Sequence, residues 1–224
     1  MGMFSSYHAL RDKPGKGVDG PPPEKGAGRF AFIFKTHFFK LVSLNLLFIL
    51  FCIPVLTIPA SLAGMTRVLM RLTREGICDL WADFFTEFKT DFVKRLLTGL
   101  IFTAVPAVAA VLPALIIAGT PTTGVWMTLS AISFMVQGYL FPLWVIVDIP
   151  LGANIHNAFA LCVMEWKRSL LLLLTAGGIH VICYFFFPVS AALMLLLSFS
   201  ASQLIVCVIV NEPIVKHVLC EQAA

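Results

Sequence analysis

Four polar side chains stand within otherwise apolar stretches of this chain: Asn45, Gln137, His180 and Gln203. Polar groups that lose water in such surroundings mark either a transport path or hydrogen bonds between helices. We expect the second role for the three carboxamides. His180 and Cys183 share one helical face, a spacing that could join a base to a nucleophile or supply two metal ligands. Because no third ligand or orienting acid accompanies them, we expect neither a catalytic nor a metal site.

The elements that carry these residues are long, apolar and uncharged. Of 224 residues, 59% are hydrophobic and 12% are charged, whereas a soluble domain has about 25% charged residues. Stretches 41–66, 96–147 and 169–211 contain no Asp, Glu, Lys or Arg. A transmembrane helix needs about 20 apolar residues. The sequence therefore predicts an all-α, polytopic helical membrane protein whose first partner is the lipid bilayer.

The 16 lysine and arginine residues set the expected orientation. Basic flanks stay in the cytosol, and the chain has one basic cluster before residue 41 and another between residues 67 and 95. The two clusters lie on one side only if stretch 41–66 turns back. Pro54 and Pro59 mark the turn, because proline removes a helical hydrogen bond. Arg67 and Arg71 then lie near the cytosolic end of a short second span, and both termini are expected to be cytoplasmic.

The predicted architecture has about six transmembrane helices and two tails. Residues 1–37 are expected to form a flexible cytosolic N-terminal tail, residues 38–211 the transmembrane helical domain and residues 212–224 a cytosolic C-terminal tail. The expected spans cover about 38–54, 57–73, 96–118, 122–147, 169–187 and 189–211.

A cytosolic amphipathic helix is predicted at 79–95, between the second and third spans. Its aromatic residues recur at intervals of three and four, which places them on one helical face. Its charges are mixed, unlike the Lys- and Arg-rich face of a lipid-binding helix. We expect the aromatic face to cover the cytosolic ends of the spans. The alternative is a helix that docks a protein partner through Trp81, Asp83, Phe84, Phe88 and Phe92.

Other classes of function lack their sequence signals. No basic stripe alternates with aromatic residues, so nucleic-acid binding is not expected. The six cysteines are scattered without metal-type or disulfide-framework spacing, and no GxxxxGK[ST] phosphate loop occurs. We expect no cofactor.

Several short motifs are spread over the first 92 residues: Lys13-Pro14-Gly15, Leu44-Asn45-Leu46-Leu47, Pro54, Pro59-Ala60, Arg67, Arg71 and Asp83-Phe84 with Phe88 and Phe92. Through these motifs the chain resembles the YesL family of bacterial integral membrane proteins. This resemblance implies a multi-pass protein of the bacterial cell membrane. The genes of relatives often lie beside those of carbohydrate-uptake systems. The resemblance therefore implies an accessory or regulatory role near a sugar transporter component. The family brings no catalytic or ligand-binding residues with it.

Two functions follow as hypotheses. The first is a non-enzymatic accessory protein associated with carbohydrate uptake or utilisation. The second is a small permease or channel for a small solute, which would work as a homo-oligomer because six short spans alone enclose a narrow pore. An intramembrane enzyme would need a polar cleft with two converging titratable groups, so we expect no enzyme.

Overall fold

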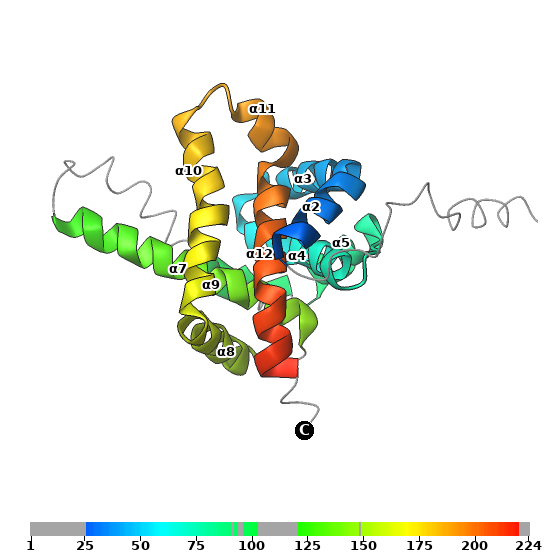
Figure 1. The fold of residues 1–224 in the computed structure, drawn as a ribbon. Helices are drawn as coiled ribbons and strands as arrows, with labels where there is room; N and C mark the ends of the chain where they lie inside the picture. The colour runs from blue at the N-terminus through cyan, green and yellow to red at the C-terminus, as the bar shows by residue number, and fades with distance from the viewer. Residues whose placement is uncertain (1–25, 91, 94–95, 103–120, 148, 220–224) are drawn as a thin grey trace, which may run out of the picture.

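The computed structural model describes residues 26–90, 92–93, 96–102, 121–147 and 149–219. Within these residues the fold is helical and contains no strand (Figure 1). In chain order the elements are α2 (Gly26–Thr36), α3 (Phe38–Cys52), η1 (Val55–Thr57), α4 (Ile58–Arg74), α5 (Leu80–Lys89), α7 (Pro121–Ile146), α8 (Leu151–Met164), α9 (Trp166–Leu172), η2 (Leu173–Gly177), α10 (Gly178–Phe185), α11 (Ala191–Leu193), η3 (Met194–Ser198), α12 (Phe199–Ile214) and η4 (Val215–Leu219).

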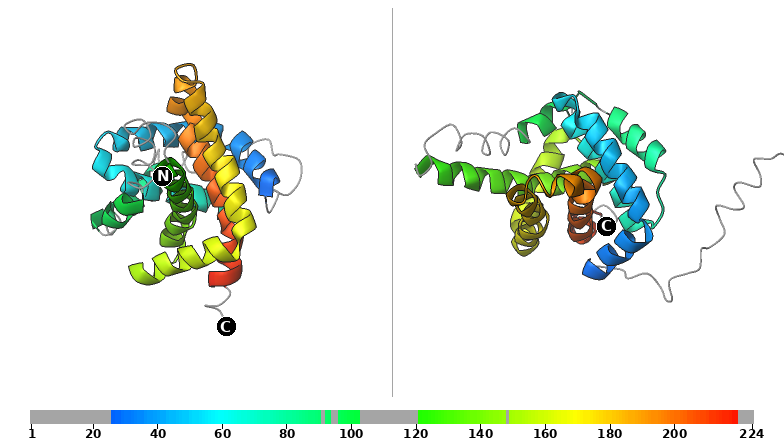
Figure 2. Two further views of the ribbon diagram at one scale, coloured as in Figure 1. Left: turned by 90° about the vertical axis from the view of Figure 1, so that its left-hand side faces the viewer. Right: turned by 90° about the horizontal axis from the view of Figure 1, so that it is seen from above.

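A helical hairpin forms the C-terminal part of the fold. One arm is α9, η2 and α10, and the other is α11, η3, α12 and η4 (Figure 1). Figure 2 shows the two arms side by side and α7 running across them rather than along them. The described helices therefore do not form a simple parallel bundle.

The turn predicted at Pro54 and Pro59 is present. A short 3-10 helix, η1, connects α3 to α4, and the Thr57 hydroxyl donates to the Pro54 carbonyl at 2.7 Å. On the far side of this hairpin, Lys40 Nζ donates to the Cys78 carbonyl at 3.4 Å. The chain that leaves α4 has thus returned to the level at which α3 begins.

Helix α4 is the most enclosed of the candidate spans, with 61% of its apolar window buried. Pro59 sits in its first turn, where the missing N–H has no helical partner to lose. A Cβ at Gly64 would stand 3.0 Å from both the ring and the carbonyl oxygen of Phe84. Glycine at this position therefore lets α5 lie directly against α4.

Two apolar clusters form the core. One surrounds α7 and includes Tyr139 and Phe141 with residues of α8 and α12. The other joins α3 to α4 through Leu44, Leu69 and their neighbours and also reaches α12. Because α12 contributes to both clusters, it connects the two halves of the protein.

The prediction of six spans is not confirmed. Among the described residues, four helices are long and apolar enough to cross a membrane: Val55–Arg74, Met127–Ile146, Trp166–Phe185 and Ala191–Leu219. The pair α2 and α3 makes a fifth only if it is counted as one span bent by 85°. The predicted span 38–54 is too short alone, because the 15 residues of α3 rise about 22 Å against a bilayer core of about 30 Å.

Both predicted tails include residues that are helical in the structure. Residues 26–36 form helix α2, which packs on α12 and buries Arg29 and Ile33. Helix α12 extends to Ile214 and continues as η4 to Leu219. Helix α2 has an apolar face that consists of Phe30, Ile33 and Phe34. The glycines and prolines that precede it favoured the interpretation of the whole segment as a tail. The predicted tail 1–25, residues 103–118 of the third span and residues 220–224 lie outside the described residues.

Candidate functional site

A cavity of about 180 Å³ lies between α3, α4, α7, α10 and α12. Three of the four polar residues singled out from the sequence line it: Gln137 from α7, His180 from α10 and Gln203 from α12. Ser202 adds a fourth polar side chain, and the remaining lining is apolar. The fold thus brings together residues that are far apart in the chain.

The two glutamines of the cavity use their N–H groups on the protein. Gln137 Nε2 donates to the Phe102 carbonyl at 2.5 Å. Gln203 Nε2 donates to Thr66 Oγ1 at 2.9 Å, and the Thr66 hydroxyl donates in turn to the Leu62 carbonyl at 2.7 Å. These partners fix which side of each carboxamide is the oxygen. Among the described residues, neither Oε1 atom receives a hydrogen bond, so both remain acceptors.

His180 is oriented by a short hydrogen-bond chain. Its Nε2 lies 3.0 Å from Ser202 Oγ, and Ser202 Oγ donates to the Phe199 carbonyl at 3.1 Å. A hydroxyl has one hydrogen, so Ser202 accepts from His180, and the pattern assigns the imidazole proton to Nε2. The Nδ1 atom is then an acceptor. Together with the two glutamine oxygens, it gives the residues that line the cavity three hydrogen-bond acceptors without a partner among the described residues.

Asn45, the fourth polar residue, lies outside this cavity and has a structural role. It is fully buried on α3. Its Nδ2 donates to the carbonyls of Met194 and Leu195 at 3.1 and 2.7 Å, and the Ser200 N–H donates to its Oδ1 at 2.9 Å. Met194 and Leu195 begin the π-helical turn η3, where the regular hydrogen-bond ladder is interrupted. Asn45 therefore satisfies backbone groups at this turn and holds α3 to the hairpin.

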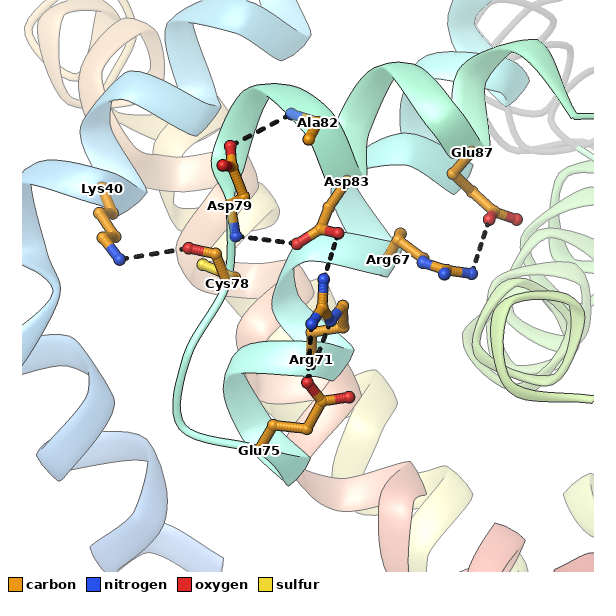
Figure 3. Close-up of polar contacts among 9 residues, drawn as sticks. All are labelled: Lys40, Arg67, Arg71, Glu75, Cys78, Asp79, Ala82, Asp83 and Glu87. Atoms are coloured by element: carbon orange, nitrogen blue, oxygen red, sulfur yellow. Dashed lines mark hydrogen bonds and ion pairs between the residues drawn. The ribbon is translucent and has the colours of Figure 1, made fainter. Parts of the chain in front are cut away.

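The predicted amphipathic helix is shorter than expected and is paired with α4. It runs as α5 from Leu80 to Lys89, and Asp79 caps it by accepting from the Ala82 N–H. Figure 3 shows its two buried carboxylates pointing at the arginines of α4. Asp83 lies 2.5 Å from Arg71 Nη1, and Glu87 lies 3.2 Å from Arg67 Nη1. Two ion pairs, four residues apart on each helix, hold the helices in register.

The aromatic face of α5 packs against α3 and α4 within the protein. Phe84 is fully buried, and Phe51 of α3 contacts the rings of Phe84, Phe85 and Phe88. Phe92 continues the row at 5.5 Å from Phe88. Of the residues proposed for partner docking, Asp83 and Phe84 are thus occupied within the chain. Trp81 is the clear exception, with 61% of its surface exposed.

His180 and Cys183 do not act on one another. Cys183 Sγ contacts Ser198 Oγ at 3.3 Å, while His180 pairs with Ser202. The described residues contain no group of three or more His, Cys, Asp or Glu side chains placed to hold a metal ion. The five cysteines in the described part of the chain are free thiols.

A charged cluster that was not predicted from the sequence lies at the base of the hairpin. Glu165 accepts from His217 Nε2 at 3.0 Å and lies 3.8 Å from Lys216, and Arg168 pairs with Glu212 at 2.9 Å. The hydrogen bond from His217, together with the nearby positive charges, holds the pKa of Glu165 below its ordinary value. The sequence signal was available, since acidic and basic residues flank both ends of stretch 169–211.

Comparison with known proteins found a family match over part of the chain. No curated protein and no solved structure matches the chain. The apolar helices are those of a membrane protein. Residues 41–111, which contain most of α3 together with α4 and α5, match a family described as "Protein of unknown function, DUF624".

Proposed function

We propose that this protein is a non-enzymatic accessory or regulatory component associated with carbohydrate uptake or utilisation, and that its cavity binds a small neutral polyol. The resemblance to the YesL family supports the biological setting. The observation that carries the binding proposal is the acceptor-rich lining by Gln137, His180 and Gln203.

The chemistry of the cavity favours a neutral ligand that donates hydrogen bonds. Two carboxamide oxygens and an imidazole nitrogen accept hydroxyl protons, and the lining holds no Asp, Glu, Lys or Arg that would select an ion. Apolar side chains complete the wall, as in most small-molecule sites. An engineered cavity of about 150 Å³ holds benzene. A volume of about 180 Å³ therefore suits a small polyol better than an oligosaccharide.

The binding proposal is tested with purified full-length protein in mild detergent. Glycerol and glucose are titrated while the unfolding temperature is followed, and Gln137→Leu and Gln203→Leu serve as site variants. We expect a saturable stabilisation of the wild type that both variants lose. Polyols also stabilise proteins without binding, by exclusion from their surface. That effect is common to all variants and is subtracted with Thr128→Val, which changes an exposed α7 residue outside the cavity. Equal stabilisation of every variant would refute the site.

A small permease is the second candidate, because the same cavity lies between candidate spans from both halves of the chain. A permease would work as a homo-oligomer, whereas an accessory protein would stay bound to a membrane partner such as a sugar transporter component. Vesicles that contain only this protein separate the two functions. Solute flux in them establishes the permease, and absence of flux together with retained polyol binding supports the accessory role.

We further propose that the protein resides in the bacterial cell membrane with both termini in the cytoplasm. The charged cluster of Glu165, Arg168 and Lys216 stands at one end of the hairpin, and exposed aromatic residues from Tyr184 to Phe187 stand at the other. Basic ends stay cytosolic, and aromatic residues favour membrane interfaces. A Glu75→Cys variant in a cysteine-free background should react with a membrane-impermeant reagent only after cells are opened. Labelling of Glu75→Cys in intact cells would show that this side of the protein faces outward and would refute the proposed orientation.

A further inference from the structure

Helix α2 packs beside α12 (Figure 1), and an apolar groove lies between α2, α9 and α12. It has a volume of about 290 Å³ and is lined by Phe30, Leu171, Ile205 and Ile209, among others. Ala27 and Leu171 are exposed at its edges. On α12 its lining extends from Ile209, three residues before the charged residue Glu212, back to Ile205, a direction that an acyl chain could follow.

A polar pocket of about 130 Å³ adjoins the charged end of this groove. Gly26 and Val208 line both spaces, so the two are neighbours. The polar lining comes from Arg29, Thr73, Asn211 and Glu212. The hydroxyl of Thr73, a residue only 7% exposed, and the amide oxygen of Asn211 are enclosed and have no hydrogen-bond partner within the described structure. Buried polar atoms of this kind are normally paired, which points to a ligand.

The groups around the pocket complement a zwitterion. The Arg29 guanidinium donates from Nε and Nη2 to the Thr73 carbonyl at 3.1 and 2.9 Å, which fixes a cation at the wall. Its remaining N–H groups and the Thr73 hydroxyl can donate to a phosphate. The Asn211 oxygen and the Glu212 carboxylate can accept from an ammonium group. Glu212 also pairs with Arg168 at 2.9 Å, so the carboxylate is held in place.

We propose that the pocket and groove together form a specific site for one molecule of phosphatidylethanolamine. The phosphate would contact Arg29 and Thr73, the ammonium would contact Asn211 and Glu212, and an acyl chain would fill the groove past Ile205. A neutral zwitterionic headgroup uses both signs of charge in the pocket, whereas the glycerol headgroup of phosphatidylglycerol brings no ammonium to Asn211 and Glu212. This site is separate from the polyol cavity.

Native mass spectrometry of the full-length protein in mild detergent tests the site with defined phosphatidylethanolamine and phosphatidylglycerol. We expect the wild type to retain one phosphatidylethanolamine in preference to phosphatidylglycerol. Arg29→Gln should weaken retention at least about tenfold, because a charge-assisted hydrogen bond contributes about 1.5–3 kcal/mol and 1.4 kcal/mol is a factor of ten. Lys35→Gln is the matched control, since Lys35 is an exposed cation of the same helix.

A second variant guards against misfolding, because Arg29 also ties α2 to α4. Ala27→Trp fills the apolar groove from an exposed position and leaves the buried arginine intact. It should abolish the retained lipid while the unfolding temperature of the lipid-free protein stays unchanged. Equal retention by wild type, Arg29→Gln and Ala27→Trp would overturn the proposal. So would preferential binding of phosphatidylglycerol, or displacement of the lipid by inorganic phosphate alone.

Discussion

Replacing Asn45 by leucine removes the contact that holds α3 to the π-helical turn η3. The variant loses three hydrogen bonds and leaves the carbonyls of Met194 and Leu195 and the N–H of Ser200 without this partner. Hydrogen bonds between membrane helices contribute about 0.6–2 kcal/mol each, and a buried group left unpaired costs about 1–3 kcal/mol. Because leucine fills a similar volume and recovers some apolar contact, we expect a net loss of about 2–4 kcal/mol.

Thermal unfolding in detergent measures this loss. For a protein of this size, about 1 kcal/mol corresponds to about 2–4 °C, so the melting temperature of Asn45→Leu should fall by about 5–12 °C. Detergent and scan rate are kept fixed, since membrane proteins often unfold irreversibly. Leu46→Ala on the exposed side of α3 is the control and should change the melting temperature little. A fall for Asn45→Leu no larger than the control would refute the argument that Asn45 anchors the turn.

Three further changes probe other contacts. Arg71→Ala removes the partner of buried Asp83 and should lower the free energy of unfolding by about 2–3 kcal/mol. This loss is smaller than for a fully buried pair because Arg71 is partly exposed. The same variant should also weaken polyol binding. Gly64→Ala should lower the melting temperature, because its Cβ meets the Phe84 carbonyl at 3.0 Å, although alanine normally stabilises a helix by about 1 kcal/mol. Glu165 has a lowered pKa in the folded protein. Its stabilisation is therefore present above the unfolded pKa of about 4.3 and is lost as pH falls through the folded value, and Glu165→Gln should remove this acid dependence.

Each of these predictions has a control on the same kind of element. Arg74→Ala removes an exposed arginine of α4 for which the described structure shows no ion pair, and it should have little effect. Gly124→Ala has open space around its Cβ and should stabilise or leave the protein unchanged. Lys167→Gln replaces an exposed cation two residues from Glu165 and leaves the contacts of Glu165 in place, so it should keep the acid dependence of the wild type. If any variant behaves like its control, the corresponding contact does not contribute as argued.

The sequence was a good guide where one local rule determined the outcome. Basic residues on both sides of stretch 41–66 required a return, and Pro54 located it. The three- and four-residue spacing of Phe84, Phe88 and Phe92 placed them on one face, and the fold buries that face against α3 and α4. Apolar length alone identified the helical membrane class. These rules act over one helix or one loop, so they can be read from a window of residues.

Features that depend on how helices meet could not be read in the same way. Gln137, His180 and Gln203 come from three helices, and periodicity does not say that they share a cavity. The π-turn η3 gave no compositional signal. The ion pairs between α4 and α5 do have a sequence signal. Arg67 and Arg71 are four residues apart, as are their partners Glu87 and Asp83 on the next helix. The mixed charge of residues 79–95 indicates only that this helix is unlike a lipid-binding one.

Helix α4 connects helix α5 to the cavity, because adjacent residues on it, about 100° apart around the helix axis, contact different elements. Thr66 fixes the Gln203 carboxamide toward the cavity, and Arg67, the next residue, pairs with Glu87 of α5. Arg71 repeats that pairing one turn later. A shift of α5 that drags these arginines must therefore also displace Thr66 and the acceptor that it orients. Since such coupling is reciprocal, a membrane partner that engages exposed Trp81 would change the affinity of the cavity, and a polyol in the cavity would change the position that α5 presents to the partner.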